Sequence, residues 1–243
     1  LTLFFLGSVL MRSAGCIVND ILDRKFDKKV LRTKNRPIAS GKVSVQLGLF
    51  YASVLCILAL LVLINFNYFT IILALASMPL AFTYPLMKRF TYWPQLFLGI
   101  TFNYGLILGW TSISEQLDII PFIFYFGAIF WTLGYDTIYG YQDIQDDEII
   151  GLKSTSIKFK GTEKSFLTIC YLILIFSLLI GGYQMNFNKY YYLFLILPIS
   201  HLIFYQIKLF DSKNPNNCLK IFKSNNYLGL LILISIFIGK NYL

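Results

Sequence analysis

Eight long apolar stretches constrain the fold of this chain more than any other feature of its sequence. A helix that crosses a membrane needs about 20 mostly apolar residues, and each of the eight approaches that length. Together they occupy most of the 243 residues, which leaves no room for a separate soluble domain. Residues 1–243 are therefore expected to form a single integral-membrane domain. The stretches cover approximately residues 1–18, 44–64, 68–86, 94–113, 118–140, 165–183, 189–208 and 226–240.

The overall composition agrees with this expectation. Hydrophobic residues make up 57% of the chain and charged residues only 14%, whereas an ordinary soluble domain carries about 25% charged residues. We therefore predict an all-α fold, a polytopic bundle of transmembrane helices embedded in a lipid bilayer.

The basic residues predict the orientation of the bundle. If residues 1–18 run toward the cytoplasm, 18 of the 21 Lys and Arg residues lie in or beside cytoplasmic connections, as the positive-inside rule requires. Topology and anionic lipid then account for the net charge of +9, so no nucleic-acid partner is expected. The cytoplasmic connections are residues 19–43, 87–93, 141–164 and 209–225, and the outer ones are 65–67, 114–117 and 184–188.

Eight of the 12 acidic residues lie in two short segments, residues 19–27 and 136–148, and each segment follows an apolar stretch. A carboxylate is costly in such a place unless it faces water or pairs with a cation. In the first segment, Asn19, Asp23 and Asp27 are spaced four apart, with Asp20 three residues before Asp23. Residues at these spacings share one face of a helix.

The second acidic segment repeats this spacing, with Asp136, Tyr139 and Asp143 at i, i+3 and i+7. The expected topology brings both segments to the cytoplasmic side, where two helices with acidic stripes could hold one or two hard cations. Mg²⁺ fits because it takes oxygen ligands and commonly shares them with substrate phosphates. Topology alone would explain the basic residues nearby, which could also bind phosphate oxygens: Arg32, Lys34, Arg36 and Lys153.

Four motifs occur in one order along the chain. They are Asn19-Asp20-x-x-Asp23-x-x-x-Asp27, residues 35–41 (Asn-Arg-Pro-Ile-Ala-Ser-Gly), Tyr135-Asp136-Thr137-x-Tyr139-x-x-x-Asp143 and residues 151–155 (Gly-Leu-Lys-Ser-Thr). With these motifs the chain resembles the UbiA superfamily of intramembrane prenyltransferases and, within it, the 4-hydroxybenzoate polyprenyltransferases. Residues 10–16, 84–89 and 225–229 add further similarity.

The resemblance implies a Mg²⁺-dependent reaction at an early step of ubiquinone biosynthesis. A polyprenyl group would pass from its diphosphate to the ring carbon of 4-hydroxybenzoate that is ortho to the hydroxyl. No obligatory protein partner is evident. Arg36 and Lys153 resemble diphosphate-binding positions. The metal ligands implied by the resemblance are Asn19, Asp20, Asp23 and Asp27 in a first site, with Asp136, Asp143 and Asp147 in a second.

Several residues keep two interpretations at this stage. Asp136 or Tyr139 could orient the acceptor phenol or take its proton. Arg12 lies within a span, where a lone Arg needs a partner; that partner could be a carboxylate of the fifth stretch, in a structural ion pair, or the carboxylate of the substrate. Lys88 and Arg89 are further candidates for binding the benzoate carboxylate, although positive-inside topology also explains them.

The resemblance implies nine transmembrane helices, and eight stretches are counted. The first is the one expected to be missing, because residues 1–18 correspond to the second helix of the family; an N-terminal truncation is therefore expected. A bacterial inner membrane is the expected location, with the acidic motifs on the cytoplasmic side. The alternatives are a UbiA-type enzyme with another acceptor, such as dihydroxynaphthoate or haem, and a cation-coupled transporter.

Overall fold

The computed structural model describes residues 1–30 and 32–240, and within them every regular element is a helix. Eight helical segments are long and apolar enough to cross a membrane. The predicted all-α transmembrane bundle is thus confirmed. Four spans consist of more than one helix. The elements of the spans are α1 (Thr2–Asp27), α2 (Val45–Leu63), α3 (Tyr68–Thr83) with η1 (Tyr84–Leu86) and α4 (Met87–Phe90), α5 (Pro94–Asn103) with α6 (Gly105–Ser114), α7 (Ile119–Gly140), α10 (Glu163–Gln184), α11 (Lys189–Ser200) with η2 (His201–Lys208), and α12 (Pro215–Lys223) with α13 (Asn225–Lys240).

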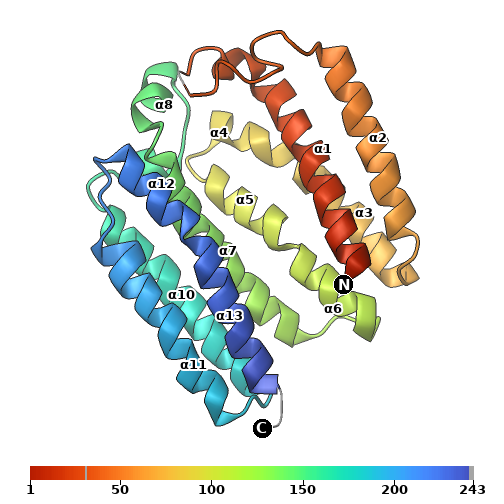
Figure 1. Ribbon diagram of the computed structural model, residues 1–243, viewed down its shortest axis with the longest axis vertical. Helices are drawn as coiled ribbons and strands as arrows, with labels where there is room; N and C mark the ends of the chain where they lie inside the picture. Colours follow the sequence, from red (N-terminus) through yellow and green to blue (C-terminus); the bar gives the residue numbers. More distant parts are fainter. Residues whose placement is uncertain (31, 241–243) are drawn as a thin grey trace.

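The spans alternate in direction, and both termini lie at the same end of the bundle (Figure 1). The opposite end carries the longer connections, with the short helices α8 (Ile144–Ile150) and α9 (Thr155–Lys158). Two predicted bounds were too short. α1 continues past residue 18 to Asp27, and the last span begins at Pro215 rather than at residue 226. Residues 19–27 therefore form the last turns of a membrane helix, and their carboxylates lie at that end of the helix.

The central helix α7 packs closely against α10 through two glycines. A Cβ atom added to Gly127 would lie 2.5 Å from Cβ of Ser177, and one added to Gly134 would lie 2.6 Å from Cε1 of Tyr171. Small residues let the backbones of two membrane helices approach closely. The van der Waals packing gained there stabilises a contact for which the bilayer supplies no hydrophobic driving force. This contact fixes the position of α7, which carries Asp136 and Tyr139 near its end.

We expect Gly134→Ala to destabilise the bundle, because the added methyl group would collide with the buried ring of Tyr171. Overpacking of a closely packed interior typically costs about 1–3 kcal/mol. The measurement is thermal unfolding in detergent. The matched control is Gly109→Ala in α6, where an added Cβ meets nothing within 4 Å. Equal melting temperatures for the two variants would contradict the proposed close contact.

The orientation predicts which exposed positions an impermeant thiol reagent can reach. Cysteines at Lys29 and Ile149, which are exposed at the end with the longer connections, should be labelled from one side of the membrane only. A cysteine at Gln116, exposed at the other end, should be labelled only from the opposite side, because the positive-inside rule keeps the basic connections together on one side. Unsubstituted protein is the control for the four native cysteines. Labelling of positions 29 and 149 from opposite sides would contradict this topology.

Candidate active site

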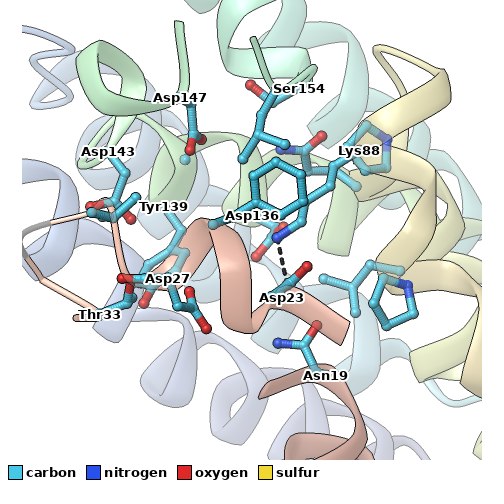
Figure 2. Close-up of a pocket in the computed structure, with 18 of the residues that line it drawn as sticks. Asn19, Asp23, Asp27, Thr33, Lys88, Asp136, Tyr139, Asp143, Asp147 and Ser154 are labelled. Atoms are coloured by element: carbon cyan, nitrogen blue, oxygen red, sulfur yellow. Dashed lines mark hydrogen bonds and ion pairs between the residues drawn. The ribbon is translucent and has the colours of Figure 1, made fainter. Parts of the chain in front are cut away.

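The two acidic segments border a single cavity of about 320 Å³ at the end of the bundle that carries the longer connections. Figure 2 shows their side chains reaching it from α1, from α7 and from the connection that follows α7. The predicted convergence of the two segments, which are far apart in sequence, is thus a feature of the structure. Predicted site residues that line the cavity are Arg12, Asn19, Asp23, Asp27, Arg36, Lys88, Asp136, Tyr139, Asp143, Asp147 and Lys153.

The helical stripe of the first segment lies as its spacing predicts. Asn19, Asp23 and Asp27 occupy successive turns of α1 and all three line the cavity. Asp23 and Asp27 are buried, with 3% and 7% of their surfaces exposed. Asp20 is absent from the lining and accepts a hydrogen bond from Arg36 at 2.9 Å. The first segment therefore presents three oxygen-bearing side chains to the cavity and uses a fourth to hold Arg36.

The predicted stripe of the second segment is only partly helical. Asp136 and Tyr139 lie on α7, but α7 ends at Gly140, so Asp143 is outside the helix. The end is tightened by three-residue hydrogen bonds from Tyr141 to Ile138 and from Gln142 to Tyr139. Asp143 still reaches the cavity because the chain turns before α8, and Asp147 joins it from α8.

Basic side chains from other elements hold the carboxylates of the first segment. Nζ of Lys88 lies 2.5 Å from one oxygen of Asp23 (Figure 2). A single guanidinium nitrogen of Arg36 lies 2.9 Å from Asp20 and 3.1 Å from Asp27. Removal of Arg36 would leave Asp20 and Asp27 without a paired cation, which is costly in a poorly solvated place. Asp23 also pairs with the guanidinium of Arg89, at 3.8 Å.

Arg32 makes an equivalent ion pair with the second segment. From the sequence it is predicted only as a residue that could bind phosphate oxygens. Its guanidinium pairs with both oxygens of Asp143 and donates a hydrogen bond of 2.8 Å to the hydroxyl of Tyr139. The bonds to Asp143 raise the pKa of Arg32 further above its ordinary value, so its charge is permanent. Nothing in the local pattern pairs residues 111 positions apart, so only tertiary structure could reveal this link.

Three predicted residues have surroundings that bear on their roles. Arg12 lines the cavity together with Asp136. Lys153 donates to the backbone carbonyl of Phe90 at 3.2 Å, at the border of the cavity. Arg89 is absent from the lining; it donates to the carbonyl of Leu22 at 2.7 Å. The geometry therefore leaves Arg89 less able than Lys88 to reach a ligand in the cavity.

The surroundings of the cavity also include residues without an acidic or basic signal in the sequence. Gln95, on α5, is buried and its side-chain carbonyl accepts a hydrogen bond of 3.0 Å from the backbone of Thr155. This bond ties the start of α9 to α5 beside the cavity.

Burial, followed by the charge of Asp143, raises the pKa of Asp147 to about 6. An additional positive charge close to Asp147 would therefore favour its ionised form.

The side chains that line the cavity fit a magnesium ion in chemistry, although the carboxylates are spread around it. Across residues 1–30 and 32–240, no three His, Cys, Asp or Glu side chains converge as a ready metal-binding group. Mg²⁺ does not require such a group, because it usually takes one or two carboxylates, waters and phosphate oxygens. One buried oxygen of Asp23 has no hydrogen-bond partner, and a guanidinium nitrogen of Arg89 lies 3.8 Å from it. That oxygen, with the side-chain oxygens of Asn19 and Asp27 on the same helix face, is a metal ligand of the appropriate kind.

Comparison with known proteins places this geometry in a family. Residues 1–233 match the UbiA prenyltransferase family. The mitochondrial 4-hydroxybenzoate polyprenyltransferase of Bos taurus is 44% identical over 240 residues, covering 98% of this chain and 64% of that protein. 4-Hydroxybenzoate geranyltransferase 2 of Lithospermum erythrorhizon is 42% identical over 241 residues, covering 99% and 78%.

Solved structures agree in fold. The apo structure of a UbiA homolog from Aeropyrum pernix K1 has a TM-score of 0.84 at 22% identity, covering 98% of this chain and 88% of that one. The structure of a UbiA homolog from Archaeoglobus fulgidus bound to GPP and Mg²⁺ has a TM-score of 0.68 at 19% identity, covering 99% and 87%. The chain described by these helices and this cavity belongs to the UbiA prenyltransferase family.

Proposed function

We propose that this protein transfers a polyprenyl group from a polyprenyl diphosphate to 4-hydroxybenzoate, in a reaction that depends on Mg²⁺. The observation that supports this most strongly is the single cavity that both acidic segments line together with Lys88, Arg32 and Arg36. Such a cavity can accept a highly charged diphosphate at the end of an apolar bundle. The chain spans 64% of the bovine relative and 65% of the rat relative, so the activity is proposed and not transferred from them.

The metal would be held by oxygen donors on both sides of the cavity. Asn19, Asp23 and Asp27 of α1 would serve one side, with Asp136, Asp143 and Asp147 on the other. When bound, Mg²⁺ would supply positive charge against the leaving diphosphate. The Archaeoglobus fulgidus homolog, whose structure carries GPP and Mg²⁺, is consistent with this proposal. Asp20 would act indirectly, through its hydrogen bond with Arg36.

Basic side chains of this chain would bind the diphosphate directly. Lys88, Arg36 and Arg32 each hold a carboxylate at the cavity, and each could turn part of its hydrogen-bonding capacity to phosphate oxygens. Lys153 would contribute from the border. Fixed cations aimed at the charge that develops on the leaving group typically contribute more to such catalysis than any other single effect. Breaking of the carbon–oxygen bond of the donor releases diphosphate and leaves an allylic cation.

The acceptor would lie deeper in the cavity, toward Asp136 and Arg12. Arg12 would pair with the benzoate carboxylate, while Asp136 or Tyr139 orients the phenol or takes its proton. The ring carbon ortho to the hydroxyl then forms the new carbon–carbon bond, and loss of its proton restores aromaticity. The alternative for Arg12 is a structural ion pair with a carboxylate of α7.

The names of the relatives favour this acceptor over the alternatives. The bovine and rat proteins and the Lithospermum proteins share 4-hydroxybenzoate as the acceptor, while the donor is polyprenyl in some and geranyl in others. Dihydroxynaphthoate and haem have no support among these names. A cation-coupled transporter is also disfavoured, because such proteins bind their ions near the bilayer midplane. These carboxylates belong to the last turns of α1 and α7 and to α8, which lie at one end of the bundle (Figure 1).

A role in ubiquinone biosynthesis follows from the proposed reaction. The protein is a multi-pass integral membrane protein by its eight apolar helical spans. The expected bacterial inner membrane has no support from the relatives, several of which are named as mitochondrial. We therefore propose a mitochondrial membrane, with the acidic segments on the side that faces the prenyl diphosphate and the soluble acceptor.

The metal site predicts the effect of neutralising one carboxylate at a time. Asp23→Asn and Asp143→Asn remove a charge at nearly constant volume, so the protein should still fold while Mg²⁺-dependent prenylation of 4-hydroxybenzoate falls. The loss of one electrostatic contact to the transition state typically costs about 10²–10³ in rate. The control is Asp146→Asn, since Asp146 belongs to the same acidic segment but does not line the cavity. Near-normal turnover in both cavity variants would contradict a site shared by the two segments.

Arg36 allows the binding of diphosphate to be separated from charge alone. Its guanidinium already bridges Asp20 and Asp27 through one nitrogen, which leaves other donors for phosphate oxygens. Arg36→Lys keeps the charge but cannot reproduce the planar fork. We expect a higher KM for the prenyl diphosphate and an unchanged KM for 4-hydroxybenzoate. Lys42→Arg, in the same connection, is the control. If Arg36→Lys leaves both constants and kcat unchanged, Arg36 acts only on topology.

A further inference from the structure

The last span is interrupted beside the active site, and a buried glutamine of a neighbouring span holds the interruption. α12 ends at Lys223 and α13 begins at Asn225, although together they form one apolar segment. The glutamine is Gln206, which is fully buried in η2. η2 has π-helical hydrogen bonding, a rare geometry that frequently occurs at functional sites.

The side-chain hydrogen bonds of Gln206 join it to this interruption and to α10. Its side-chain nitrogen donates to the carbonyl of Ile221 at 3.2 Å and to the hydroxyl of Ser224 at 2.9 Å. Its side-chain oxygen accepts a hydrogen bond of 3.1 Å from Tyr171. A buried amide is costly unless it is hydrogen-bonded. These three bonds therefore favour one relative placement of η2, α10 and the end of α12.

A second buried contact holds the interruption from the side of α7. Nε1 of Trp131 donates a hydrogen bond of 2.8 Å to the side-chain oxygen of Asn225. The amide nitrogen of Asn225 donates to the carbonyl of Phe222 at 3.0 Å, which lies in the last turn of α12. Two different spans thus fix Ser224 and Asn225, and with them the placement of α12 against α7.

The residue placed by this arrangement is Phe222, whose ring packs against the active site. Its centroid lies 4.5 Å from the ring of Tyr139 and 5.8 Å from that of Tyr135. Tyr139 lines the cavity and accepts the hydrogen bond from Arg32. In the proposed reaction Arg32 would turn from Tyr139 toward phosphate oxygens. The ring of Phe222 is then the contact that keeps the ring of Tyr139 in place.

We propose that Gln206 is a positioning residue for prenyl transfer, acting through Phe222 on the ring of Tyr139. This inference rests on the proposed function, because it assigns Gln206 a part in that reaction. Gln206 itself is outside the cavity lining and touches neither substrate. It selects the placement of α12 in which Phe222 supports Tyr139, and the phenol of the acceptor then meets Tyr139 in one orientation.

The test is a pair of variants and their combination. Gln206→Met keeps the volume and removes the hydrogen bonds, and Phe222→Leu removes the ring. We expect each to lower kcat about 10- to 100-fold, as a small misplacement of a reacting group does, while KM for both substrates is unchanged. The double variant should be no slower than Phe222→Leu alone, since residues that act through one another are not additive.

A matched control separates positioning from loss of stability. Thr111→Val removes the buried hydrogen bond of 3.1 Å between the hydroxyls of Thr70 in α3 and Thr111 in α6. α6 and α12 lie toward opposite ends of the bundle (Figure 1). Thr111→Val should lower the melting temperature and leave kcat intact. If Gln206→Met does not accumulate, Ser224→Ala replaces it, since it removes one acceptor of the same amide. Unchanged kcat in these variants, or losses that add in the double variant, would overturn the proposal.

The fluorescence of Trp131 tests the placement of α12 without depending on enzyme activity. With Trp93→Phe and Trp110→Phe, Trp131 is the only tryptophan, and its indole bonds to Asn225. We expect Gln206→Met to shift its emission maximum, and Thr111→Val to leave it unchanged. Wild-type protein that does not prenylate 4-hydroxybenzoate contradicts the proposed function only. An unshifted emission in Gln206→Met overturns the positioning role whether or not wild type is active.

Discussion

Ion pairs between elements that are distant in sequence organise the cavity of this protein. An apolar bundle with carboxylates on its central helices would expose uncompensated charge to a poorly solvated interior, a cost of several kcal/mol per ion. Lys88 and Arg36 compensate the end of α1, and Arg32 compensates the turn that follows α7. Such pairs add little net stability. Their effect is to draw three connections together around one cavity.

The same pairs give the cavity its chemical character. In the proposed reaction each carboxylate would exchange its guanidinium or ammonium partner for a divalent metal, and each basic group would turn toward phosphate. A diphosphate and its metal carry charges of both signs, so their binding would redistribute the partners without leaving a buried charge unpaired. A membrane-embedded site for such a ligand therefore needs carboxylates and basic side chains together.

Packing within the membrane supplies the rigidity that the ionic contacts lack. α7 is held against α10 at Gly127 and Gly134, and against α12 through the rings of Tyr135, Tyr139 and Phe222. The helix that carries Asp136 is therefore fixed along much of its length. The more polar connections at its end need only hold Asp143 and Asp147, which lie beyond the last turn of the helix.

The number of spans and the face of α1 that carries Asn19, Asp23 and Asp27 could be predicted from the sequence, because they depend on apolar runs and on the helical period of neighbouring residues. The family could be predicted because its motifs occur in order along the chain. The prediction that Asp143 continues the helical stripe of α7 was wrong. α7 ends at Gly140 through hydrogen bonds and packing that no local pattern signals. The tertiary structure alone decided which cation meets which carboxylate, as with Arg32 and Asp143. It also decided that Gln206 and Trp131 hold the interrupted last span. The physical reason is that these contacts join separate spans, and their geometry exists only after the helices have packed.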